Sequence, residues 1–245
     1  MKDQNTKFIV SVLIPAYNEE KTIKLVLEAV SLQSIAGVKF EVIVVDDASI
    51  DSTSKILDDC HNLFTHRITF EKNKGKGAAI IAALDAASGD YVLVQDADLE
   101  YNPSEYDTLI KPVIEFGAEI VIGSRFLAPS WTRVNYFWHK VGNIIITLLF
   151  NVLNNTTFTD IYSGHIVFKR SLLANVLLTR ERWDQQAEIL SKICPRTKII
   201  YEVAINYTGR TYDEGKKIRA LDVIPVIFTI IRERTLRLFA SSAKL

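Results

Sequence analysis

Two carboxylates one residue apart follow an apolar segment near the middle of the chain. Residues 91–95 carry the apolar and β-favouring side chains of a buried strand, and Asp96 and Asp98 come directly after it. Like charges this close raise each other's pKa unless a cation or hydrogen-bond donors keep both ionised. A divalent cation takes oxygen ligands and neutralises phosphate charge, so it can hold both carboxylates against a phosphorylated ligand. The pair therefore indicates a metal–phosphate site, with capping of the next helix as the alternative.

Further acidic residues follow two other predicted strands. Residues 8–15 and 40–45 are apolar runs typical of buried strands, with Glu19 in the loop after the first and Asp46 and Asp47 directly after the second. Open α/β sheets bind their ligands at the carboxyl ends of the strands. We therefore expect these acids to cluster with the central pair at one sheet edge, where Asp47 suits the hydrogen-bond donors of a base or a ribose.

Cations from separate loops could complete this site: Arg125, Arg210, Lys216 and Lys217. Together with the acids they describe a site for a nucleotide diphosphate that carries a leaving group. The glycine-rich residues 73–77 lack the spacing of a P-loop, and we interpret them as a flexible start to the next helix.

The elements that must position these residues alternate along the chain. Helices are predicted at residues 21–34, 52–63, 77–89, 103–116, 131–154, 183–193 and 218–238, and further strands at 67–71, 119–122, 163–169 and 198–205. Strand, polar loop and helix repeat three times in the first half, which predicts an α/β fold with a parallel sheet and right-handed crossovers.

Composition and charge narrow the classes of function. The 245 residues are 48% hydrophobic, enough for a sizeable core, and Lys plus Arg and Asp plus Glu are both 29. A net charge of zero gives no general attraction to nucleic acid, so we expect no nucleic-acid partner. Cys60 and Cys194 lie in no metal or redox spacing, which favours buried thiols in a reducing compartment. The first residues lack the pattern of a signal peptide, and no apolar run reaches the length of a membrane span.

Two segments could instead lie on a membrane surface. Residues 131–154 are rich in aromatics with cations between apolar blocks, although composition alone favours a core helix there. Residues 218–238 are amphipathic and carry three arginines near their end, Arg232, Arg234 and Arg237. We expect a main domain over residues 1–220 and a membrane-associating amphipathic helix over residues 221–245.

Five short motifs occur in order at residues 12–20 (VLIPAYNEE), 44–49 (VVDDAS), 95–98 (QDAD), 123–125 (GSR) and 207–217 (YTGRTYDEGKK). Together they resemble the inverting family 2 glycosyltransferases with a GT-A fold, in particular the dolichyl-phosphate mannose synthases and polyprenyl-phosphate glucosyltransferases. The resemblance covers roughly residues 8–220. It implies a Rossmann-like, mostly parallel sheet flanked by helices, with C-terminal amphipathic helices.

The resemblance also implies roles for individual residues. Donor-binding positions are Pro15, Tyr17, Glu19, Val45, Asp47, Asp96, Ala97, Asp98, Arg210 and Lys216. Mg²⁺ or Mn²⁺ would be bound by Asp96, Asp98 and Glu100. Catalytic roles fall on Asp98, Arg125, Arg210 and Lys216, with Glu188 and Asp160 as the acidic residues on the acceptor side.

The acceptor leaves alternatives open. The family usually has Arg or Lys, a natural partner for an acceptor phosphate, where this chain has Ile166; His165, Lys140 or Lys169 could compensate. A lipid phosphate is already anionic and needs no strong base, whereas a sugar hydroxyl would need Glu188 or Asp160 as general base.

Three functional hypotheses follow. The favoured one is transfer of a hexose, with inversion, from a nucleotide-diphosphate sugar of the GDP-mannose or UDP-glucose type to a polyprenyl phosphate, peripherally on the cytoplasmic face of a membrane. The second keeps the donor and uses a glycan or glycolipid hydroxyl. The third is a weakly active donor-binding subunit that recruits a membrane partner protein.

Overall fold

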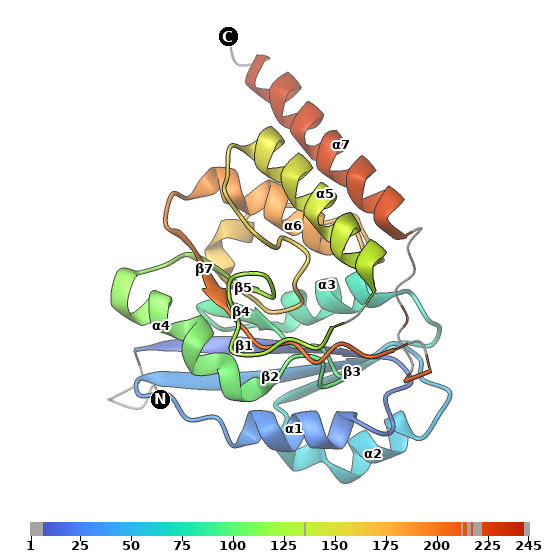
Figure 1. Cartoon of the computed structure of the whole chain (residues 1–245). Helices are drawn as coiled ribbons and strands as arrows, with labels where there is room; N and C mark the ends of the chain where they lie inside the picture. Colours follow the sequence, from blue (N-terminus) through green and yellow to red (C-terminus); the bar gives the residue numbers. More distant parts are fainter. Residues whose placement is uncertain (1–6, 135, 212, 215–216, 218–221, 243–245) are drawn as a thin grey trace.

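The computed structural model describes residues 7–134, 136–211, 213–214, 217 and 222–242, and a seven-stranded sheet lies at its centre (Figure 1). The strands are β1 (Phe8–Ala16), β2 (Val38–Asp46), β3 (His66–Thr69), β4 (Tyr91–Val94), β5 (Ile120–Ser124), β6 (Ile166–Lys169) and β7 (Ile200–Ala204). Their order across the sheet is β3-β2-β1-β4-β6-β5-β7. Only β6 runs antiparallel to its neighbours, β4 and β5, so the predicted mostly parallel sheet is confirmed.

Helices cover both faces of the sheet. They are α1 (Ile23–Ser31), α2 (Thr53–Asp59), α3 (Lys76–Ala86), α4 (Tyr106–Phe116), α5 (Phe137–Asn154), α6 (Gln185–Ile193) and α7 (Val223–Ser242). Short 3₁₀ turns occupy η1 (His61–Leu63), η2 (Pro103–Glu105), η3 (Arg170–Leu173) and η4 (Cys194–Arg196). Side chains alternate along each strand, so every central strand feeds two cores. One core joins the sheet to α1, α2 and α4, and the other joins it to α3, α5, α6 and α7 (Figure 1).

Two predicted boundaries differ from the structure because of tertiary contacts. The helix predicted from residue 131 begins at Phe137, because Thr132 forms a β-bridge to Tyr207 and Arg133 N–H donates to the Tyr207 carbonyl. The strand predicted from residue 163 begins at Ile166, because the preceding residues pass beside the cavity described below. Both departures place extra loop at the same edge of the sheet.

The C-terminal helix shares the core of the rest of the chain. Val226 and Ile230 of α7 are fully buried in the core that contains α5 and α6, and Figure 1 shows α7 running beside α5. The predicted division after residue 220 lies among residues outside those described, so it stays a prediction. What the structure shows is that α7 packs on α6 and α5 as part of one body.

The outer faces of α5 and α7 are apolar and open to solvent. Phe137 and Trp138 are 68% and 75% exposed, and Phe228 of α7 is 67% exposed, whereas Ile146 and Phe150 of α5 are buried. Composition alone favoured a core position for this segment; only one side of α5 is in the core. No helix within the described residues has the length and hydropathy needed to cross a bilayer. Cys60 and Cys194 are free and buried, as predicted.

Candidate active site

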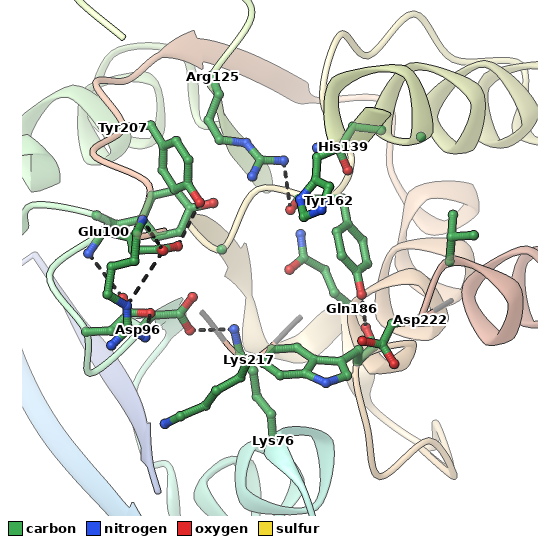
Figure 2. Close-up of a pocket in the computed structure, with 18 of the residues that line it drawn as sticks. Lys76, Asp96, Glu100, Arg125, His139, Tyr162, Gln186, Tyr207, Lys217 and Asp222 are labelled. Atoms are coloured by element: carbon green, nitrogen blue, oxygen red, sulfur yellow. Dashed lines mark hydrogen bonds and ion pairs between the residues drawn. The ribbon is translucent and has the colours of Figure 1, made fainter. Parts of the chain in front are cut away.

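A cavity of about 1180 Å³ lies at the carboxyl ends of β1, β2 and β4. Its floor contains the residues that follow these strands, together with Tyr207 and Arg210, which bond to the carboxylates there. The segment before α5 and the start of α5 form another side (Figure 2). The structure brings the following predicted residues into its lining: Pro15, Tyr17, Glu19, Asp47, Asp96, Ala97, Asp98, Glu100, Arg125 and Arg210. Acids from three separate strand ends therefore converge, as the parallel sheet requires.

Each acidic loop contains one non-glycine residue with a left-handed backbone. These are Asn18 (φ 52°), Ala48 (φ 58°) and Leu99 (φ 60°). Such conformations are uncommon and persist where surrounding contacts fix them. Here they turn the chain sharply just after each strand.

Asp47 organises the loop that precedes α3. Its carboxylate accepts hydrogen bonds from Lys74 N–H at 2.7 Å, Gly75 N–H at 2.8 Å and the Asn73 side chain at 3.0 Å. Gly75 has φ 104°, a conformation that favours glycine. Residues 73–75 lead into α3 at Lys76, close to the predicted helix start, and Asp47 ties this loop with three hydrogen bonds.

Cationic side chains lie among the central carboxylates. Lys76, the first residue of α3, forms an ion pair with Asp96 (Figure 2). Arg210 donates to Asp98 at 2.6 Å and to the Glu19 carboxylate at 3.2 and 3.3 Å. Burial and the neighbouring Asp96 and Glu100 carboxylates raise the pKa of Asp98 to about 7, against the opposing effect of Arg210. The site thus concentrates negative charge that needs cations.

Glu100 anchors the segment that carries Arg210. Its carboxylate accepts hydrogen bonds from the Tyr207 hydroxyl at 2.7 Å and from the Arg210 backbone N–H at 2.6 Å (Figure 2). Lys217 also pairs with Glu19, at 2.6 Å. Lys216 lies outside the described residues.

Arg125 lines the cavity and is held there by hydrogen bonds. Its guanidinium donates to both oxygens of Asp160, at 2.7 and 2.9 Å, and to the Tyr162 carbonyl at 3.1 Å. A second cation lies near the same ring: Arg125 lies 5.7 Å and the Lys140 ammonium 5.8 Å from the Phe126 ring centre. Lys140 also lines the cavity.

Three predicted site residues lie away from the cavity. Val45 is fully buried in the core, because its side chain points to the α3 face of the sheet. Asp160 is fully buried behind Arg125, with both oxygens engaged by it. Glu188 is fully buried on α6, where it accepts hydrogen bonds from Thr179 and Arg180 N–H groups and from Lys192. Both carboxylates are thus buried and engaged by neighbouring hydrogen-bond donors.

Of the three residues suggested as substitutes for a basic residue at position 166, two do not offer a positive charge to the cavity. Ile166 is buried in the core of β6. Burial lowers the pKa of His165 to about 4, so this fully buried imidazole is neutral. Lys169 pairs with Glu119 at 2.7 Å, at the opposite end of β6 from the cavity. Only Lys140 of the three lines the cavity.

Several lining residues were missed by the sequence reasoning. They include Lys76, Tyr101, Tyr162, Trp183, Gln186 and Tyr207. The closely spaced glycines offered a signal, because a Cβ at Gly75 would lie 2.6 Å from the Glu181 carbonyl and one at Gly77 2.5 Å from the Arg180 carbonyl. Glycines needed for close packing indicate a fixed loop. For Tyr162 and Trp183 no local signal exists.

Gly164 provides a test of how tightly Asp96 is positioned. A Cβ at this position would lie 2.6 Å from an Asp96 carboxylate oxygen and 2.7 Å from the Tyr101 ring. We expect Gly164→Ala to displace Asp96 and to lower any turnover that depends on Asp96 by about 10²-fold, the cost of roughly 1 Å of misplacement. Ser171→Ala, at an exposed residue of η3 outside the cavity lining, is the control in a steady-state assay. Equal rates for the two variants would contradict the tight fit.

Comparison with solved structures identifies the fold. Glucosyl-3-phosphoglycerate synthase from Mycobacterium tuberculosis, in complex with Mn²⁺, UDP and glucosyl-3-phosphoglycerate, superposes with a TM-score of 0.70. The match covers 95% of this chain and 81% of that chain at 24% identity, and another structure of that enzyme holds Mg²⁺ and UDP. The chain has the GT-A fold of glycosyltransferases.

Sequence comparison identifies the family. The profile of Glycosyl transferase family 2 matches residues 11–177, more than half of the chain. The chain is 31% identical to UDP-N-acetylglucosamine–dolichyl-phosphate N-acetylglucosaminyltransferase of Methanococcus voltae, over 86% of this chain and 90% of that protein. It is 28% identical to undecaprenyl-phosphate 4-deoxy-4-formamido-L-arabinose transferase of Proteus mirabilis, over 94% of this chain and 70% of that protein. The chain belongs to glycosyl transferase family 2.

Proposed function

We propose that this glycosyltransferase moves a hexose, with inversion, from a nucleotide-diphosphate sugar to a polyprenyl phosphate. The observation that carries the proposal is one cavity with two chemically different sides. Asp47, Asp96 and Asp98 line the donor side, whereas Arg125 and Lys140 lie beside exposed apolar residues of α5 on the other. The names of the relatives from M. voltae and P. mirabilis, both transferases to lipid phosphates, support the same acceptor class.

The donor side suits Mg²⁺ or Mn²⁺, which Asp96, Asp98 and Glu100 would hold. Within the described residues no three His, Cys, Asp or Glu side chains already surround a common ion position. The carboxylates are paired with Lys76 and Arg210 instead, and these cations mark where positive charge is stabilised. A bound divalent ion would neutralise charge on the departing diphosphate. Arg210 and Lys217, released from Glu19 and Asp98, can then pair with the phosphates.

The acceptor side favours a phosphate over a hydroxyl. Arg125 is fixed by Asp160 and lines the cavity, and the Lys140 ammonium lies near the same Phe126 ring and also lines it. A phosphate held there is already anionic and can attack without a general base. The two acids that a hydroxyl acceptor would need, Asp160 and Glu188, are both buried and hydrogen-bonded elsewhere.

The apolar faces of α5 and α7 fit a bilayer surface. Exposed aromatics on α5, including Phe137 and Trp138, continue from the cavity lining onto the outer surface. Phe228 extends the apolar surface along α7, and the exposed Arg232, which also pairs with Glu233 at 2.7 Å, supplies a cation for anionic head groups. We place the enzyme peripherally on the cytoplasmic face, a compartment in which free thiols such as Cys60 stay reduced.

A product assay tests the acceptor. The protein is incubated with labelled nucleotide sugars and Mn²⁺, together with a polyprenyl phosphate, the matching polyprenol without phosphate, or a glycan. We expect label on the polyprenyl phosphate alone. Label on the glycan or on the polyprenol would overturn the proposed acceptor, although it would still show that the protein is a transferase.

Lys140 gives a residue-level prediction for the same acceptor. Lys140→Ala removes one of two cations beside Phe126, and we expect the KM for the lipid phosphate to rise about tenfold or more, the scale of a charge-assisted hydrogen bond. The KM for the donor should not change. Lys111→Ala, which breaks only the exposed 3.9 Å pair with Glu115, is the control. A rise in the KM for the donor instead would show that Lys140 binds the donor, and it would contradict the proposed contact with the lipid phosphate.

A further inference from the structure

A group of buried polar residues beneath the cavity wall has no part in the chemistry described so far. They are Asp184, Glu188 and Lys192 around α6, and Thr229 and Glu233 on α7. Asp184, Glu188, Thr229 and Glu233 are 6%, 0%, 1% and 7% exposed. Burying a charge to this degree costs folding free energy unless the charge is paired, so the partners of these residues matter.

Glu188 holds the loop that leads into α6. One carboxylate accepts hydrogen bonds from Thr179 N–H at 2.9 Å, the Thr179 hydroxyl at 2.9 Å and Arg180 N–H at 2.9 Å. Lys192 completes its partners at 2.8 Å. Glu188 therefore fixes the first two residues of the loop over 179–183, and the Tyr162 hydroxyl fixes its last by donating to the Trp183 carbonyl at 2.8 Å.

The same loop supports the donor side of the cavity. Ala78 N–H donates to the Glu181 carbonyl at 3.0 Å, and Gly77 packs so closely on residues 180 and 181 that a Cβ would lie 2.5 Å from the Arg180 carbonyl. These contacts set the start of α3, where Lys76 pairs with Asp96. Trp183, at the end of the loop, lines the cavity with its ring 5.6 Å from the Lys76 ammonium.

Helix α7 holds this assembly in place from the other side. The Thr229 hydroxyl donates to Asp184 at 2.8 Å, directly after Trp183 in the chain. Glu233 lies 3.7 Å from the Lys192 ammonium, which in turn binds Glu188. Two polar contacts thus run from α7 to the residues that hold the loop over 179–183.

We propose that Thr229 and Glu233 are positioning residues for the donor site. Through Asp184 and through Lys192 and Glu188, they set the loop over residues 179–183 and with it Trp183 and the start of α3. The opposite face of the same helix carries the exposed Phe228, so one helix contributes both to the apolar surface and to the donor site. This role rests on the donor site of the proposed function, and nucleotide affinity is its readout.

Nucleotide binding in single-residue variants tests this role. Thr229→Val keeps the shape of the side chain and removes its hydroxyl, whereas Thr229→Ser keeps the hydroxyl. Glu233→Gln keeps the shape and removes the charge. Calorimetric titration with UDP or GDP and Mn²⁺ should show affinity reduced about two- to tenfold in Thr229→Val and Glu233→Gln and full affinity in Thr229→Ser. Thr229→Val loses the hydrogen bond to Asp184, and Glu233→Gln loses the 3.7 Å ion pair with Lys192. The KM for the lipid phosphate should stay unchanged.

Matched controls separate positioning from general stability. Thr235→Val removes a hydroxyl on the same helix that bonds only the Ile231 carbonyl, and it should bind nucleotide like the unmodified protein. If Thr229→Val and Glu233→Gln lower the unfolding temperature but keep full nucleotide affinity, the positioning role is overturned. If Thr229→Val does not fold, Glu233→Gln decides in the same way. Absence of nucleotide binding by the unmodified protein would instead refute the proposed function.

Discussion

Asp98→Ala is expected to lower sugar transfer by about 10³-fold or more while the protein stays folded, because preorganised charge stabilisation of the leaving group is worth that much in other enzymes. Asp98 lies between Asp96, Glu100 and Arg210, where a metal and a diphosphate would meet. The measurement is labelled product formed per time at saturating donor and acceptor. Asp107→Ala, an exposed acid in the first turn of α4, is the control and should retain full activity. Activity of Asp98→Ala within tenfold of the control would remove Asp98 from the mechanism.

The ionised Asp98 carboxylate should also lower the stability of the fold. Burial and like charges raise the pKa of Asp98 to about 7, above the ordinary value of 3.8, so its ionised form disfavours folding. That cost grows as the pH rises from 3.8 through 7 and is fully present above it. Asp98→Asn should therefore raise the unfolding temperature more at pH 8 than at pH 4. A larger gain at pH 4 would contradict the raised pKa.

Asp160→Asn is expected to destabilise the fold by about 3–5 kcal/mol, because breaking a buried ion pair leaves the other charge uncompensated. Asp160 is fully buried and receives two hydrogen bonds from the Arg125 guanidinium. Urea denaturation measures the loss, and transfer should fall at the same time because Arg125 loses its fixed position.

An exposed pair provides the comparison for Asp160. Glu119→Gln breaks the partly exposed pair with Lys169, and the change should stay within about 1 kcal/mol. Loss of activity in Asp160→Asn with unchanged unfolding free energy would restore Asp160 as a general base, and the hydroxyl acceptor with it.

Much of the fold was predictable because local patterns carry it. The apolar runs before Glu19, Asp46 and Asp96 became β1, β2 and β4, and parallel neighbours necessarily bring their carboxyl ends together. The antiparallel direction of β6 was not predictable in this way, because the apolar residues of a strand do not encode its direction. The start of α5 was missed since a bridge between Thr132 and Tyr207, distant in sequence, competes with the helix.

The roles of acidic residues were harder to predict than their presence. Asp160 and Glu188 are acids of the right type in the right region, yet their partners, Arg125 and Thr179, are set by tertiary contacts. Nothing in the local sequence distinguishes a carboxylate that faces a cavity from one that caps a buried loop. Lys76 was missed for the converse reason, because the glycines around it suggested flexibility.

The most direct test of the central claim is a calorimetric titration of the protein with UDP and with GDP, each with and without Mn²⁺. We predict that one of the two nucleotides binds at one site per chain, that binding requires or is strongly enhanced by Mn²⁺, and that Asp98→Ala abolishes the metal effect. Absence of heat with both nucleotides, in the presence and in the absence of Mn²⁺, would contradict a donor site at these strand ends.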